Sequence, residues 1–204
     1  MQHRLRTLLL GTALAFSVGA GAAQAAIVFQ DNFNAENGGT GLLNYTGFAN
    51  WAVTGGSVDL IGNGFFDLLP GNGLYIDMNG TTGAGGTIAT TTVFAPGTYS
   101  VSFDFAGSAR GLNGIVTVTL GDLVQTITLS SSTPFTTQSF TANVSNAGTL
   151  NLTFASGIPG GDLGGLLDNV VVRTPDVAVP EPASALLLGA GLLGLGLLGR
   201  RRAA

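Results

Sequence analysis

The residues that most enzymes use for catalysis are nearly missing from this chain. Cysteine is absent, and the single histidine is His3, close to the N-terminus. Ser-His-Asp and Cys-His catalysis both need an imidazole base, and zinc sites usually need histidine or cysteine ligands. A carboxylate pair of the glycosidase kind needs two well-placed acids, yet Glu36 is the only glutamate between residues 26 and 179. We therefore expect a binding or structural protein and not an enzyme.

Aromatic rings and carboxylates are the side chains that remain suited to ligand contact. Tyr45, Trp51 and Tyr75 could stack on the apolar face of a sugar ring, because amphipathic rings tolerate partial exposure. Core packing is the alternative, and it is favoured for Trp51, which alternates with Val53 in a strand pattern. Residues 26–179 hold two arginines against ten acidic residues, a net charge of −8. This excludes nucleic acid as a partner, because nucleic acid needs a basic surface, but allows divalent cations and neutral glycans.

The segments that must position these side chains indicate an all-β domain. Short apolar-alternating runs are separated by glycine, asparagine and proline, and the clearest run, 97–107, alternates aromatic and aliphatic with polar residues. The expected strands are 26–29, 48–53, 57–61, 74–78, 87–94, 97–107, 116–120, 123–129, 140–144, 150–154 and 167–173. We predict an antiparallel two-sheet sandwich, a jelly roll, over residues 26–173, flanked by an N-terminal signal helix and a C-terminal transmembrane helix.

The N-terminal segment is typical of a signal peptide. Arg4 and Arg6 precede an apolar stretch that ends in Ala23-Gln24-Ala25, a small-x-small cleavage site. We expect residues 1–25 to be removed on export, with a retained anchor helix as the alternative.

The C-terminal segment has three parts. A linker, 174–182, ends in Pro180-Glu181-Pro182, and the 17 residues 183–199 carry no charge. A helix of that length covers roughly 26 Å, at the short end of what spans a bilayer core. The tail 200–204 opens with Arg200-Arg201-Arg202, which the positive-inside rule keeps cytoplasmic. An ordinary C-terminal anchor is one interpretation, but the two prolines keep the segment before the membrane extended and accessible.

This arrangement over residues 180–202 resembles the PEP-CTERM sorting signal of Gram-negative bacteria. The resemblance implies that a membrane-embedded exosortase recognises the motif, removes the tail and passes the protein outward. The membrane helix is then temporary, as in a GPI signal. The expected location is across the inner membrane, with transient anchoring there, and then the cell surface or the extracellular space.

The domain itself resembles the galactose-binding-like jelly rolls of carbohydrate-binding modules. The resemblance rests on the Asp31-Asn32-Phe33 opening, a tryptophan strand, the segment 96–106 and the closing Leu166–Val172. In such jelly rolls, an Asp at the start of the last strand helps to hold a structural Ca²⁺. Here the ligands would be Asp168 with Asp31, Asn32 and Glu36, since calcium takes six to eight oxygens. Alternatively, Asp168 caps loop amides, or Asp168-Asn169 simply opens the strand. It shares strand parity with Val170 and Val172, so we expect it to face inward.

Three functions are consistent with the sequence. The first is an exported, non-catalytic surface or extracellular-matrix protein that associates with exopolysaccharide. The second is a calcium-stabilised carbohydrate-binding module, and the third is a structural or adhesive β-protein with no small ligand.

Overall fold

The described part of the chain is built from short strands. The computed structural model describes residues 25–145, 150–175 and 191. The elements, in order, are β1 (Ile27–Asp31), a 3-10 helix η1 (Glu36–Gly39), β2 (Trp51–Gly55), β3 (Asp59–Gly62), β4 (Leu74–Asp77), β5 (Thr87–Thr90), β6 (Gly97–Ala106), β7 (Gly114–Leu120), β8 (Leu123–Leu129), β9 (Thr136–Val144), β10 (Thr153–Ser156) and β11 (Leu166–Arg173).

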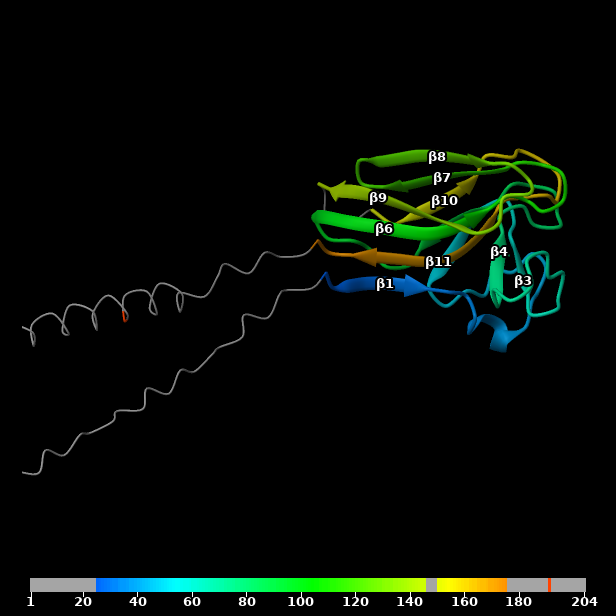
Figure 1. Ribbon diagram of the computed structural model, residues 1–204, viewed down its shortest axis with the longest axis horizontal. Coiled ribbons are helices and arrows are strands. Elements are labelled where there is room, and N and C mark those ends of the chain that lie inside the picture. The colour runs from blue at the N-terminus through cyan, green and yellow to red at the C-terminus, as the bar shows by residue number, and fades with distance from the viewer. Residues whose placement is uncertain (1–24, 146–149, 176–190, 192–204) are drawn as a thin grey trace, which may run out of the picture. The chain divides into compact units, whose positions relative to one another are not determined.

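These strands form two antiparallel sheets (Figure 1). Sheet A has the order β3-β4-β11-β6-β9, and β1 also pairs with β11. Sheet B has the order β2-β5-β10-β7-β8. The prediction of an all-β, two-sheet sandwich is therefore confirmed.

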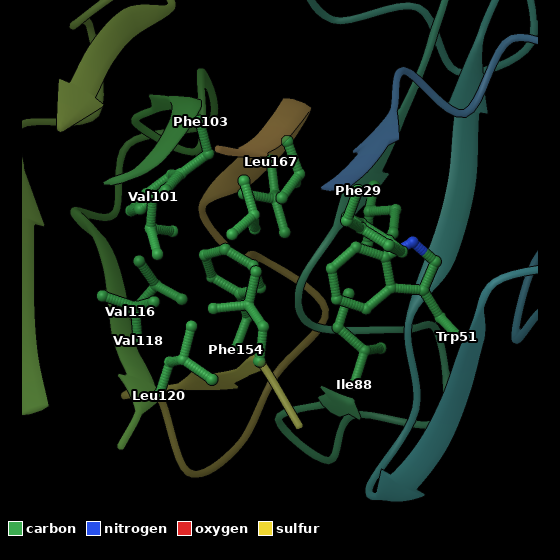
Figure 2. Packing of buried hydrophobic residues seen from close by; sticks show 14 of the residues in the cluster. Phe29, Trp51, Ile88, Val101, Phe103, Val116, Val118, Leu120, Phe154 and Leu167 are labelled. Carbon is green, nitrogen blue, oxygen red and sulfur yellow. The ribbon is translucent and has the colours of Figure 1, made fainter. Parts of the chain in front are cut away.

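The main core lies between the two sheets. Inward residues of β6 alternate with polar ones as the sequence predicted, and Val101, Phe103 and Phe105 are fully buried. Figure 2 shows Phe154 in the middle of this core, with its ring centroid 4.8 Å from that of Phe103 and 5.9 Å from that of Trp51. Because each such side chain contributes roughly 1.5–3 kcal/mol on burial, this core is the main source of stability.

A second, smaller cluster covers the outer face of sheet A. Ile61, Tyr75, Ala106 and Leu166 point away from the main core and are buried by Phe65, Leu68, Leu69 and Phe135. Three of these four covering residues come from the segment 63–73, which we call the β3–β4 loop. Gly62, the last residue of β3, precedes this loop with φ +114°, and a Cβ there would lie 2.0 Å from the Gly73 carbonyl oxygen. The close approach of the loop ends therefore requires glycine.

A bulge in β11 changes the direction of Asp168. The register shifts between Asp168 and Val171, and Asn169 has φ +49°. Leu167 and Val170 both belong to the main core, while Asp168 pairs with Asp104 on the opposite, outer face of sheet A. The expectation that Asp168 faces inward is wrong, because the extra residue of a bulge breaks the period of two.

The predicted sorting segments lie outside the described residues, except for a few border positions. They are the signal peptide 1–25, the Pro180-Glu181-Pro182 motif, the transmembrane segment 183–199 and the arginines of 200–204. Within 25–145, 150–175 and Gly191, no helix is long and apolar enough to cross a membrane.

Candidate functional site

The three aromatic residues predicted to stack on sugar are buried. The exposed fraction is 2% for Trp51, 9% for Tyr45 and 0% for Tyr75. Trp51 and Tyr45 belong to the main core, and Tyr75 lies in the second cluster beneath the β3–β4 loop. None of them offers a ring face to solvent, so the structure corrects this prediction.

Their polar atoms hold neighbouring segments in place. The Trp51 indole N–H donates to Asp31 Oδ2 at 3.1 Å, and the Tyr45 hydroxyl donates to the Gly47 carbonyl at 2.9 Å. The Tyr75 hydroxyl donates to Asp67 Oδ1 at 3.1 Å and accepts from the Leu69 amide at 2.9 Å. Burial raises the pKa of Tyr75 to about 12. These rings stabilise the sandwich and its loops.

The predicted calcium ligands are only partly brought together. Asp31 lies close enough to Asp168 and to Glu36 to raise the pKa of both, after the larger effect of burial. Asp31 and Asn32 line a cavity of about 280 Å³ beside Asn169. The Glu36 carboxylate instead accepts from the Ala49 amide at 3.1 and 3.2 Å. In the described ranges, no three acidic or histidine side chains are grouped so that they could hold a metal ion. Calcium binding at these residues therefore stays a prediction.

Asp168 faces a second carboxylate across the sheet. Asp168 is 1% exposed, and its Oδ1 accepts from the amide of Asn169 at 2.7 Å. Asp104 accepts from the Thr137 hydroxyl at 2.6 Å and the Asn169 side-chain amide at 2.9 Å. Burial, followed by repulsion from Asp104 and Asp31, raises the pKa of Asp168 to about 7. The one backbone amide that Asp168 accepts is that of Asn169, inside β11, so the prediction that Asp168 caps loop amides stays a prediction.

A different cavity lies at the β3–β4 end of sheet A. We call it the Arg110 pocket; its volume is about 340 Å³. Its walls come from strands β3 and β4 and from loops that are distant in sequence. The lining residues are Leu43, Asp59, Ile61, Phe66, Leu68, Asp77, Thr81, Arg110 and Asp162.

An ion pair forms the polar side of the Arg110 pocket. Arg110 donates to Asp77 Oδ2 and, at 2.5 Å, to the Asp162 carbonyl. Asp77 is 2% exposed and also accepts from the amides of Asn79 and Gly164, each at 3.0 Å. Burial raises the pKa of Asp77 to about 7, although the two amides and Arg110 oppose this and Asp59 adds to it. Burial has the larger effect on the pKa, because the cost of desolvating the carboxylate exceeds the stabilisation that its hydrogen-bond and ion-pair partners provide.

Asp59 lies beside Asp77, as its partner in the pairing of β3 with β4. Its Oδ1 accepts from the Asn44 amide at 2.7 Å and the Thr81 amide at 3.1 Å, and its Oδ2 accepts from the Thr81 hydroxyl at 2.8 Å. With both oxygens engaged and 5% of its surface exposed, Asp59 positions two loops.

Phe66 supplies an exposed ring at the pocket. Its exposed fraction is 62%, and its φ is +45°. Phe65, its neighbour, turns toward the second cluster, and the two rings meet edge to face with centroids 5.0 Å apart. Asp67 anchors the loop by accepting from the Gly64 amide at 3.2 Å and from Tyr75. The sequence analysis missed Phe66; two consecutive aromatic residues between Gly64 and Asp67 were the available signal, because both cannot face one core.

The Arg110 pocket therefore combines an open aromatic ring, a guanidinium group and hydrogen-bond acceptors. Such a combination suits a polar ligand with an apolar face, since stacking needs a ring face and orientation needs a few directed polar groups. It lies on a sandwich fold, which by itself hosts many functions.

The chain has a β-sandwich domain similar in fold to carbohydrate-binding modules and a sorting signal that indicates export. More particularly, it carries the PEP-CTERM protein-sorting motif, matched over residues 178–202. No curated protein matches the chain in sequence.

Two solved structures show the likeness in fold. The CBM22-1-CBM22-2 tandem domain of Paenibacillus barcinonensis Xyn10C aligns with a TM-score of 0.50 and 16% identity, covering 81% of this chain and 50% of that one. This chain therefore spans half the length of that tandem. The K3 cleaved adhesin domain of Lys-gingipain from Porphyromonas gingivalis w83 aligns with a TM-score of 0.50 and 16% identity, covering 73% of this chain and 100% of that one.

Proposed function

We propose that this chain is a non-catalytic surface or matrix protein that binds an extracellular polysaccharide in the Arg110 pocket. The sorting motif supports delivery to the outside of the cell, and the likeness to carbohydrate-binding modules supports a glycan as ligand. The observation that carries the proposal is Phe66, a ring that is 62% exposed and lines the same pocket as the charged side chains of Arg110 and Asp77. Stacking of the flat face of a sugar on this ring removes apolar surface from water, which stabilises the complex.

A binding role without catalysis fits the chemistry of the pocket. Asp59 and Asp77 are its two most buried carboxylates, and both accept backbone amides that hold loops. Neither histidine nor cysteine occurs between residues 26 and 204. The groups at this pocket are therefore suited to holding a ligand, and the domain lacks the histidine and cysteine side chains that most often act as catalytic bases and nucleophiles.

A glycan array with the exported protein tests the proposal. The wild type should bind a polysaccharide saturably, and Phe66→Ala should weaken that binding roughly tenfold, the equivalent of about 1.4 kcal/mol of lost stacking. Val93→Ala is the matched control, because Val93 is also exposed, at 49%, and does not line the pocket. Equal glycan binding by both variants would show that Phe66 does not contribute to the binding site. Binding to no glycan would favour the structural or adhesive function.

Export and processing are tested separately. We propose that an exosortase recognises Pro180-Glu181-Pro182 and releases the protein from its transient place in the inner membrane. Replacing these three residues by alanine should leave a longer, membrane-bound product in cell fractionation, while Pro175→Ala should behave as wild type. Unchanged size and location of the triple variant would reject processing at this motif.

A further inference from the structure

Sheet B carries no charged residue in any of its strands. β2, β5, β10, β7 and β8 contain only apolar and uncharged polar side chains. Every charged residue found in a strand belongs to sheet A; these residues are Asp31, Asp59, Asp77, Asp104, Asp168 and Arg173. In a chain with a net charge of −4, two copies repel least where they meet through sheet B.

β8 is an open edge of this sheet. Among the described residues it pairs with β7 alone, in register from Leu123 opposite Leu120 to Leu129 opposite Gly114, and Figure 1 shows it at the border of the sandwich. A two-residue turn joins the strands, so Leu120 and Leu123 form a hydrogen-bonded pair and such pairs alternate from there. The backbone N–H and C=O groups of Val124, Thr126 and Thr128 therefore point away from β7, into solvent.

Little protects the β8 edge. Val124 is 70% exposed, and Thr126 and Thr128 are also exposed. The side-chain amide of Gln125 donates to the Thr126 carbonyl at 3.1 Å, an exposed bond that another donor can replace. β8 has no proline, no charge and no bulge, the devices by which edge strands avoid pairing. In contrast, β2 at the other edge of sheet B has five residues and a register shift between Val53 and Gly55.

We propose that a second copy of this chain pairs with β8, antiparallel and about a two-fold axis at Thr126. In this pairing Leu123 would face Leu129, Val124 would face the similarly shaped Thr128, and Gln125 would face Ile127 of the other copy. The outward backbone N–H and C=O groups of residues 124, 126 and 128 would then form hydrogen bonds with those of the other copy. The sheets B of the two copies would join into one continuous sheet. The interface is isologous and closed, as in most homodimers.

Cysteine cross-linking of the exported protein tests this pairing, because the chain has no cysteine of its own. At the axis, residue 126 faces itself at about 5.5 Å between Cα atoms, within the reach of a disulfide. Thr126→Cys should therefore give a covalent dimer on a non-reducing gel. Thr128→Cys is the matched control: it lies on the same strand and is exposed, but the two copies of residue 128 would be about 14 Å apart.

Each result decides the proposal. A dimer of Thr126→Cys with a monomeric Thr128→Cys supports it. Equal cross-linking of both variants would indicate random collision and overturn it, as would no cross-linking or cross-linking of Thr128→Cys alone. Sedimentation without any cysteine gives an independent measurement. The wild type should dimerise, and Thr126→Lys, which places two like charges at the axis, should weaken the dimer by more than roughly tenfold. A monomeric wild type would also overturn the proposal.

Discussion

At the buried pair of Asp77 and Arg110, two effects act on the pKa of Asp77 in opposite directions, and this leads to a testable prediction. Arg110 favours the ionised carboxylate, whereas burial of Asp77, which is 2% exposed, favours the protonated acid. Burial is the larger effect and raises the pKa of Asp77 from 3.8 to about 7. Asp77→Asn keeps the shape of the side chain and removes its titration. The variant therefore separates the two effects through the pH dependence of stability.

The sign follows from proton linkage. Between pH 3.8 and about 7 the folded state binds more protons at Asp77 than the unfolded state does, so stability falls as the pH rises. The contribution of Asp77 is fully present below pH 3.8 and is lost by the time the pH has passed 7. Each pH unit within this range is worth about 1.4 kcal/mol. From pH 5 to pH 8 the wild type should lose about 2–3 kcal/mol through this group.

Urea denaturation of both proteins at pH 5 and pH 8 measures the effect. Because other groups titrate in both proteins, the informative quantity is the stability of Asp77→Asn minus that of the wild type. This difference should move in favour of the variant by about 2–3 kcal/mol between the two pH values. A difference that does not change with pH would refute the dominance of burial. Such a constant difference is also the result expected if Arg110 controls Asp77, because the carboxylate is then ionised in the folded and the unfolded state throughout this range.

Two further predictions concern the core and the predicted metal. Trp51→Ala should lower the free energy of unfolding by about 3–5 kcal/mol, because it leaves a cavity beside Phe29 and Phe154; a loss below about 1 kcal/mol in urea denaturation would contradict the core role of Trp51. If Ca²⁺ binds beside Asp168 as predicted from the sequence, calcium should raise the melting temperature of the exported protein and Asp168→Asn should abolish the gain, whereas identical melting curves in calcium and in EDTA would contradict binding.

The strands were predictable because their alternation is set by a single buried face. In β6 and β7 every second residue is apolar, and those residues are the buried ones. The same rule failed for Asp168, because the bulge at Asn169 shifts the period by one residue. A bulge is a local irregularity of the backbone, and an Asp-Asn pair before three valines does not predict one.

The site was harder to predict than the fold. Tyr75 was predicted to stack on sugar only because its ring is amphipathic. It belongs to the second cluster and is buried by the return of the β3–β4 loop. The same loop exposes Phe66, so the error about Tyr75 and the omission of Phe66 have one cause. The Arg110–Asp77 pair joins residues 33 positions apart, a contact that depends on the packing of loops and is not encoded in any local pattern.

The construction of the Arg110 pocket explains why its carboxylates are retained despite their cost. Asp59 holds the amides of Asn44 and Thr81, and Asp77 holds those of Asn79 and Gly164. Loops rich in glycine bury too little apolar surface to be fixed by packing, so directed hydrogen bonds must position them. The raised pKa of Asp77 is the energetic consequence of placing such an anchor beneath the loops. The stability that the sandwich core provides thus allows a pocket whose walls are held by hydrogen bonds to buried carboxyl groups.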